Sequence, residues 1–333
     1  MVRGIQCYYN HPFQAKRKKG RLLWSRGEVE LYHYPTRRNR KGALLLIPSL
    51  INKSTIFDLL PDISLIRALK AAGYDCYLID WGYPTQDREQ KTLQSLIERR
   101  LLPAAAIAAA HHGAPLNALG YCMGGLFLTA AALKETSLFK TLIFLATPWN
   151  FKSGKDLFSS QAKTSLSFLI KTKEGEKPSP LSARQIQVFF AALNGDRIAR
   201  KFATFAAMDQ KSPEACRFVA VEDWLNDGPD LPASLVEDCL RRWYLENQPG
   251  RRQWHVGTTQ IDPSKISVPV LNVLPSRDRV VPEFSARALA EAIPGSTFLK
   301  PDCGHIGLIT SRSAAKKVVA PMIEWLDKQN LLS

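Results

Sequence analysis

Gly120-Tyr121-Cys122-Met123-Gly124-Gly125 joins a strand-like run, 116–119, to a helix-like run, 126–133. Glycine two residues before and two residues after a central residue is the pattern of a nucleophile elbow, a tight strand-to-helix turn that presents one side chain at its tip. Gly120 and Gly124 fill those positions, where a side chain would collide with the neighbouring backbone. The same pattern is compatible with a buried thiol at an ordinary strand-to-helix turn. A catalytic interpretation therefore requires an acid and a histidine elsewhere in the chain.

The length and composition favour a globular protein. The chain has 333 residues, of which 45% are hydrophobic, enough for one large domain with an insertion or for two ordinary domains. The N terminus has no apolar signal region, and the longest apolar run, 101–110, is too short to cross a bilayer. The six cysteines are scattered without a C-x-x-C pair, which favours reduced thiols. We therefore expect a cytoplasmic protein without a signal peptide.

The net charge of +15 is concentrated at the N terminus. Residues 1–41 hold eleven lysines and arginines against two glutamates, with clusters at 16–21 and 37–41. Charge of this density attracts anionic surfaces, including nucleic acid, anionic lipid and phosphorylated cofactors. No aromatic-interleaved or helix-turn-helix pattern accompanies it, so a solvated tail and turn is the favoured interpretation.

The order of apolar runs predicts an α/β protein. A hairpin is expected over 21–34, and buried strands alternate with helices thereafter, which is the repeating unit of a parallel sheet. The expected strands are 43–47, 74–79, 116–119, 140–146, 268–274 and 297–299, and the expected helices are 61–72, 93–110, 126–133, 283–292 and 313–328.

The alternation is interrupted between residues 149 and 265. Apolar residues recur there at helical spacing over 157–170, 186–193 and 235–245, with no convincing strand. We expect three parts: a basic N-terminal segment, 1–20; a sheet core made of 21–148 and 266–333; and a helical cap, 149–265, inserted into that core.

In an open α/β sheet, the binding and catalytic residues lie just beyond the carboxyl ends of the strands. Polar residues follow five of the predicted strands, at Pro48 to Asn52, Asp80, Cys122, Asp278 and His305. A strand-end aspartate alone is more often a helix cap, and a lone histidine is more often structural. Together, a nucleophile, an acid and a histidine in this order match the α/β-hydrolase arrangement. We therefore predict an α/β-hydrolase fold, a mostly parallel sheet flanked by helices with an inserted helical cap, and a catalytic triad of Cys122, Asp278 and His305.

The other candidate residues follow from the triad. The oxyanion would be held by the backbone N–H of Met123 and by one from the Ser49-Leu50 region, for which we choose Leu50. Asp80 is expected to bond the backbone of its own loop. His111, His112 and His255 have no partner at metal-ligand spacing, so no metal site is expected.

A cysteine nucleophile suits transfer of an acyl group. The thiolate is the reactive form, and a neighbouring histidine can accept the thiol proton near neutral pH. Attack on an acyl thioester gives another thioester, which stays reactive towards a second nucleophile. A serine would give a more stable oxygen ester, which is better suited to hydrolysis.

Several segments together resemble polyhydroxyalkanoate synthases. They are Ile79-Asp80-Trp81-Gly82-Tyr83-Pro84, the elbow, Ala146-Thr147-Pro148, Trp224-Leu225-Asn226-Asp227-Gly228-Pro229, Val268-Pro269-Val270-Leu271-Asn272 and Gly304-His305-Ile306-Gly307. The resemblance implies that Cys122 carries a growing acyl chain, that His305 activates it, and that Asp278 assists either the 3-hydroxyl or the histidine. It implies 3-hydroxyacyl-CoA and a growing polyester as substrates, with no cofactor beyond the CoA thioester itself.

The chain looks like the short forms of that family, which work with a second, different subunit. A homodimer and a location at the surface of a polyester granule are further expectations. The basic N terminus and the stretch 151–220 depart from the family pattern, which leaves the preferred acyl chain length open. Two alternatives stay open: a cysteine-dependent hydrolase of the same fold, either thioesterase or esterase, and a module that binds an anionic surface through its N terminus with an inert triad.

Overall fold

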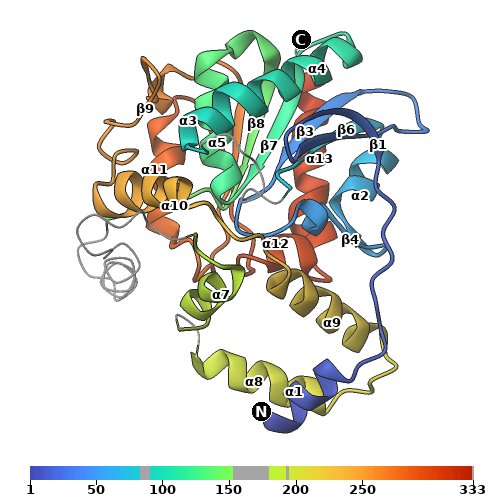
Figure 1. Cartoon of the computed structure of the whole chain (residues 1–333). Helices are drawn as coiled ribbons and strands as arrows, with labels where there is room; N and C mark the ends of the chain where they lie inside the picture. The colour runs from blue at the N-terminus through green and yellow to red at the C-terminus, as the bar shows by residue number, and fades with distance from the viewer. Residues whose placement is uncertain (83–90, 153–179, 193–194, 332–333) are drawn as a thin grey trace.

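An eight-stranded sheet forms the centre of the computed structural model, which describes residues 1–82, 91–152, 180–192 and 195–331 (Figure 1). The strand order is β1-β2-β6-β3-β7-β8-β11-β12. The strands are β1 (Arg21–Arg26), β2 (Val29–Tyr34), β3 (Gly42–Ile47), β6 (Tyr74–Asp80), β7 (Leu116–Tyr121), β8 (Phe139–Leu145), β11 (Val270–Val273) and β12 (Thr297–Leu299). The six strands β6, β3, β7, β8, β11 and β12 run parallel to one another. Strand β2 pairs antiparallel with β6, and β1 pairs antiparallel with β2. The predicted mostly parallel sheet and the N-terminal hairpin are confirmed.

Helices cover both faces of this sheet. On one face lie α4 (Leu102–His112) and α5 (Met123–Lys134), and on the other lie α2 (Leu65–Ala71) and α13 (Ala320–Leu331) (Figure 1). The central strands are therefore buried on both sides, as every residue of β7 is, which explains why they read as continuous apolar runs rather than alternating ones. A further helix, α11 (Glu283–Ala292), has the predicted bounds.

Some helix boundaries differ from the prediction. The helix expected from Pro61 begins at Leu65, because Ser64 caps its first turn by accepting a hydrogen bond from the Arg67 amide. Residues just before it form the short antiparallel pair β4 (Asp58–Leu60) and β5 (Ile63–Ser64). The helix expected from 93 consists of α3 (Leu93–Leu96), a π-helical turn, η3 (Ile97–Leu101), and α4.

Three helices lie at the end of the molecule away from the sheet: α7 (Ala183–Ala192), α8 (Gly195–Ala206) and α9 (Pro213–Asn226) (Figure 1). We refer to them as the distal helices. The expected helix 186–193 corresponds to α7, and 235–245 corresponds to α10 (Ala233–Asp238) with the π-helical turn η5 (Cys239–Leu245). The expected helix 157–170 lies outside the described residues. The division into core and inserted cap stays a prediction.

One expectation for the stretch 149–265 was wrong. Two short strands, β9 (His255–Val256) and β10 (Thr259–Gln260), pair there in antiparallel fashion. Gly257 turns the chain between them with a φ of 60°, a conformation that favours glycine. Strands of two residues leave no alternating pattern in the sequence, so they could not be read from it.

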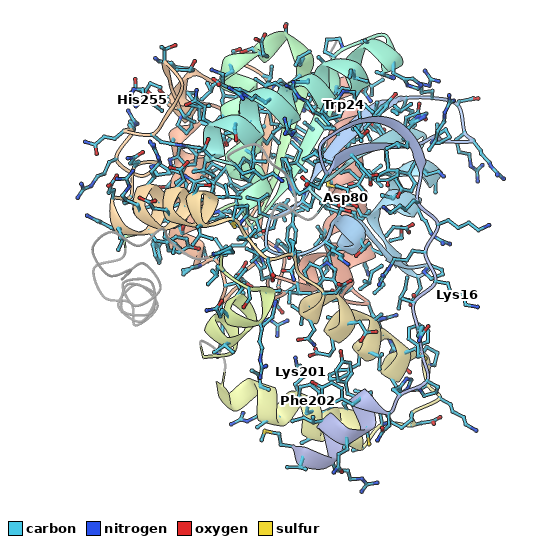
Figure 2. The ribbon with its side chains drawn as sticks, in the orientation of Figure 1. Lys16, Trp24, Asp80, Lys201, Phe202 and His255 are labelled. Atoms are coloured by element: carbon cyan, nitrogen blue, oxygen red, sulfur yellow. The ribbon has the colours of Figure 1, made fainter. Side chains whose placement is uncertain are left out.

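The N-terminal segment is not simply a solvated tail. Residues Val2–Tyr9 form helix α1, which packs against α8 (Figure 1). A separate small apolar cluster unites this segment with the distal helices; its members are Phe205, Ala215 and Val219, with Cys7, Tyr8, Phe13, Met208 and Phe218 packed against them. The basic clusters themselves are exposed, as expected for 16–19 and 37–41, and Figure 2 shows Lys16 on the outside of the segment that connects α1 to β1. No helix in the described ranges is long and apolar enough to cross a membrane.

Candidate active site

The elbow lies between the carboxyl end of β7 and the first turn of α5. Cys122 has φ 54° and ψ −123°, a strained conformation for a residue with a side chain. Its amide donates a hydrogen bond to the Leu145 carbonyl at 2.9 Å, which ties the turn to the end of β8. The thiol is therefore held in one position at the carboxyl edge of the sheet.

The glycines of the elbow stand where backbone segments approach closely. A Cβ on Gly120 would overlap the backbone of Gly125, and one on Gly124 would overlap the carbonyl oxygen of Ile47 at the end of β3. Both positions leave room for hydrogen only, as the motif requires. The approach at Gly124 also brings the loop after β3 against the elbow.

Asp278 and His305 come together from two separate loops. Asp278 follows β11, and His305 lies between β12 and α12 (Gly307–Thr310). The His305 Nδ1 donates to Asp278 Oδ2 at 2.7 Å. The other oxygen of Asp278 accepts from the amides of Val280 and Val281 at 2.8 and 2.9 Å. Because Nδ1 is engaged, the Nε2 side of the ring is the one available to the thiol.

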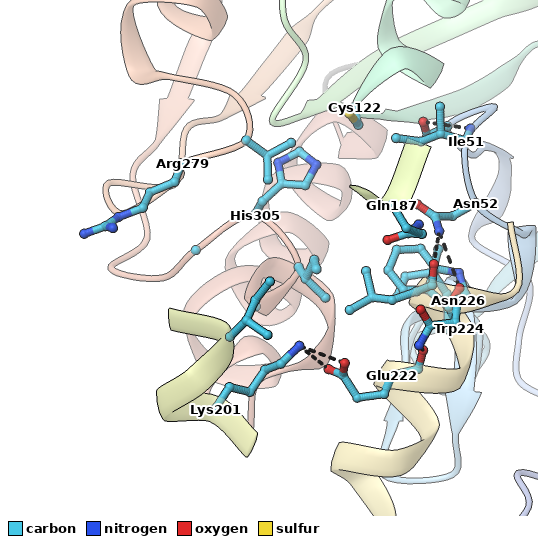
Figure 3. Close-up of a pocket in the computed structure, with 18 of the residues that line it drawn as sticks. Ile51, Asn52, Cys122, Gln187, Lys201, Glu222, Trp224, Asn226, Arg279 and His305 are labelled. Atoms are coloured by element: carbon cyan, nitrogen blue, oxygen red, sulfur yellow. Dashed lines mark hydrogen bonds and ion pairs between the residues drawn. The ribbon is translucent and has the colours of Figure 1, made fainter. Parts of the chain in front are cut away.

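Electrostatics favour a charged histidine beside this thiol. Burial lowers the pKa of His305, but the Asp278 carboxylate, an ionised Cys122 and hydrogen bonds to both side chains outweigh it and raise the pKa to about 10. Figure 3 shows His305 and Cys122 at the same end of one cavity. The three predicted triad residues therefore lie together, with His305 bonded to Asp278 and at the same end of the cavity as Cys122 (Figure 3).

The candidate oxyanion donors belong to the first turn of α5 and to the loop after β3. Met123 is the first residue of α5, so its N–H is among those with no partner inside the helix. The loop after β3 lines the cavity through Pro48, Ser49 and Ile51, whereas the Leu50 side chain is completely buried. The oxyanion role of the Met123 and Leu50 amides stays a prediction.

A cavity of about 820 Å³ opens in front of Cys122 and His305 (Figure 3). Its walls come from the sheet edge, the distal helices and α1. Apolar side chains predominate, and they include Ile5, Tyr8, Ile51, Ile56, Ile198, Phe202, Trp224, Leu225, Val280 and Ile306. Lys201 and Glu222 form an ion pair in the wall, with the lysine Nζ 2.7 Å from both carboxylate oxygens. Such a cavity can hold an extended apolar group attached to the thiol.

The fold family is established by a family model. The model described as alpha/beta hydrolase fold matches residues 42–311. The chain belongs to the α/β-hydrolase fold family. The predicted fold class is confirmed.

The relatives of this α/β hydrolase agree with the resemblance seen in the motifs. The chain is 28% identical over 315 residues to the poly(3-hydroxyalkanoate) polymerase subunit PhaC of Thiocystis violacea, and the match covers 92% of this chain and 88% of that protein. It is 27% identical, with the same coverage, to the subunit of that name from Allochromatium vinosum. Among solved structures, a monoacylglycerol lipase from Paleococcus ferrophilus superposes with a TM-score of 0.56 at 16% identity, covering 91% of this chain and 99% of that one, and supports the fold alone. The resemblance to polyhydroxyalkanoate synthases is confirmed.

Two residues of this site escaped the sequence prediction. Tyr121 stacks on the His305 ring with centroids 5.2 Å apart, and its hydroxyl donates to the His305 carbonyl at 3.4 Å. Gly125 packs against Thr147, whose side chain a Cβ would overlap. Tyr121 directly precedes Cys122, and Gly125 directly follows Gly124, so both are part of the elbow motif. The motif does not show which residues they contact, because those residues lie further along the chain.

Asp80 and His111 have partners outside the Cys122–His305 site. Asp80 accepts a hydrogen bond from the Gly82 amide at 3.1 Å, as expected for a loop tie. His111 lies 2.8 Å from the Tyr77 hydroxyl. Within the described ranges, no group of three or more His, Cys, Asp and Glu side chains is arranged to hold a metal ion.

Proposed function

We propose that this protein is an acyltransferase that polymerises 3-hydroxyacyl-CoA into polyhydroxyalkanoate through a thioester on Cys122, releasing CoA. The observation that carries the proposal is a cysteine at the nucleophile elbow of an α/β hydrolase, beside the Asp278–His305 pair and a largely apolar cavity. The two relatives named as polymerase subunits support the substrate class.

The first half-reaction loads the enzyme. His305 accepts the proton of the Cys122 thiol, and the sulfur attacks the thioester carbonyl of 3-hydroxyacyl-CoA. The carbon–sulfur bond to CoA breaks, and His305 returns the proton to the CoA sulfur. The acyl group is then a thioester of Cys122, at the same level of reactivity as before.

The second half-reaction extends the chain. The 3-hydroxyl of the next 3-hydroxyacyl-CoA attacks the Cys122 thioester, loses its proton to His305 and forms an ester, while the Cys122 thiol takes that proton. Cys122 then attacks the CoA thioester of the lengthened chain and CoA leaves. The substrate supplies all the activated groups, so no further cofactor is required.

The geometry supports one of the two roles considered for Asp278. Its Oδ1 accepts two amides and its Oδ2 accepts the His305 Nδ1–H. Both oxygens are therefore committed to the loop and to the histidine, which favours a role in orienting and charging His305 over direct contact with the 3-hydroxyl.

Product analysis tests the proposal. With 3-hydroxybutyryl-CoA or a longer analogue, alone and with a matching second subunit, we expect CoA release together with insoluble polyester. Cys122→Ala should lower CoA release by about 10³-fold or more, because the covalent route is lost. Cys216→Ala, a replacement of a partly buried cysteine on α9, is the matched control and should retain activity.

One outcome would replace the proposal. Stoichiometric free 3-hydroxy acid without polymer, in the presence of the second subunit, would identify a cysteine-dependent hydrolase instead. Cys122→Ser discriminates further, since its oxygen ester is a poorer acyl donor than the thioester. We expect that variant to lose chain growth.

A further inference from the structure

Helix α1 contributes to the wall of the cavity that contains Cys122. Ile5, Tyr8 and Tyr9 line this cavity together with Cys122 and His305, although they lie more than a hundred residues earlier in the chain. Tyr9 is largely exposed and lies at the rim, whereas Ile5 and Tyr8 are partly buried. The N-terminal segment is thus part of the site and not an appendage to it.

Several contacts fix α1 in this position. Gly4 is buried against α8 so closely that a Cβ would overlap the carbonyl oxygen of Phe202. The Tyr8 hydroxyl donates to Asp223 Oδ1 on α9 at 2.8 Å. Just after the helix, the His11 Nε2 lies 2.8 Å from the Gln210 carbonyl. These contacts hold α1 on two of the distal helices.

The part of the wall that α1 contributes lies away from the thiol. Lys201 on α8 and Glu222 on α9 are at the opposite side of the cavity from Cys122 (Figure 3), and α1 lies along α8 at the end of the molecule away from the sheet (Figure 1). An acyl chain attached to the thiol and extended along the cavity therefore points towards the wall to which Ile5, Tyr8 and Phe202 belong.

We propose that α1 is a specificity-determining element, in which Ile5 and Tyr8 limit the length of the alkyl group of the 3-hydroxyacyl unit that the cavity accepts. This inference rests on the proposed acyl transfer for its choice of substrate. Its physical basis is the space filled by the two side chains. A methylene group that an apolar pocket cannot accommodate is rejected by about 10-fold or more. Removing the tyrosine ring makes room for several methylene groups.

The test measures chain-length selectivity in two independent ways. The first is the ratio of turnover (kcat/KM) for 3-hydroxyoctanoyl-CoA to that for 3-hydroxybutyryl-CoA. The second is the ratio of alkylation rates of Cys122 by N-octylmaleimide and N-ethylmaleimide, quantified on the Cys122 peptide by mass spectrometry. The second readout requires only a reactive thiol at the end of the cavity.

Four variants separate side-chain volume from loss of structure. Tyr8→Ala and Ile5→Ala should each raise both ratios about tenfold. Tyr8→Phe loses the hydrogen bond to Asp223 but keeps the ring, so it should leave the ratios unchanged. Gln6→Ala, an exposed position on the same helix outside the cavity, is the matched control. Thermal melts of all four verify folding.

The outcomes distinguish the two proposals. If both ratios stay at the wild-type value in Tyr8→Ala and in Ile5→Ala while N-ethylmaleimide still labels Cys122 at the wild-type rate, α1 does not set chain length and the inference is overturned. If the maleimide ratio rises but neither acyl-CoA is turned over by any version of the protein, the cavity wall is as inferred and the proposed acyl transfer fails.

Discussion

At the scale of single residues, the charge of His305 is the property on which the proposed chemistry depends. A buried imidazole would ordinarily lose its proton more readily than one in water. Here the Asp278 carboxylate and an ionised Cys122 reverse that tendency and raise the pKa of His305 from 6.5 to about 10. In the proposed acyl transfer, an imidazolium in this place is the acid that protonates the leaving CoA sulfur.

Asp278→Asn should reverse this shift. Asparagine keeps the shape of the side chain but removes its charge, so the pKa of His305 should fall below its wild-type value of about 10. NMR of ¹³C-labelled histidine between pH 5 and 11 measures the change directly. Cys122→Ala removes the other negative group and should lower the pKa of His305 by a smaller amount. A wild-type His305 that titrates near 6.5 would contradict the electrostatic account.

The same shift has a consequence for stability. Because the pKa of His305 is higher in the folded chain, its proton stabilises the fold fully below about pH 6.5, and this contribution is lost as the pH rises towards 10. Between pH 6.5 and 10, the difference in urea midpoint between wild type and Asp278→Asn should therefore be largest near pH 6.5 and should shrink as the pH rises.

The site residues differ in how far the sequence could predict them. Cys122, Asp278 and His305 each follow a strand, and parallel strands bring their carboxyl ends to one edge, so their meeting was predictable. Tyr121 and Gly125 were not, because their importance lies in contacts with His305 and Thr147, and no local pattern records which side chain packs on which ring.

At the scale of elements, the buried strands were predicted well and the distal helices less well. Strands such as β3 and β7 are buried along almost their whole length. In the sequence they are therefore short apolar runs bounded by glycine or turn residues, which makes them easy to recognise. Helices α8 and α9 escaped prediction, although Ser212 caps α9 and Pro213 begins it. The apolar residues of α8 recur on one face of the helix, so its pattern was present in the sequence. Those of α9 are spread around the helix, because α9 packs both on the main core and on the small cluster completed by α1.

Gly4→Ala tests the docking of α1 as an element. The added methyl overlaps the Phe202 carbonyl, so the helix must shift away from α8, at a cost of about 1–3 kcal/mol. Hydrogen exchange of residues 1–12 should become about tenfold faster or more, while exchange in β7 and α5 stays unchanged. Gln6→Ala is again the matched control, and equal protection of α1 in both variants would contradict the close packing.

At the scale of the whole molecule, no residue of the basic clusters 16–19 and 37–41 lines the cavity that contains Cys122. The clusters at 16–19 and 37–41 are exposed on the segments that flank the N-terminal hairpin. Their sequence predicted the exposure, but it could not reveal that the preceding helix α1 contributes Ile5, Tyr8 and Tyr9 to the cavity wall. Substitutions at 16 and 18 therefore address the surface charge without touching α1.

The last prediction concerns that surface. If the N-terminal cluster contacts an anionic surface, Lys16→Gln combined with Lys18→Gln should elute from heparin at clearly lower salt than wild type, because fewer ions are released on binding. Lys316→Gln combined with Lys317→Gln removes the same charge from two exposed lysines elsewhere, and it should elute close to wild type. Equal elution of the two double variants would show that net charge alone, screened over about 10 Å at 0.1 M salt, governs retention. The N-terminal cluster would then have no special role as a contact surface.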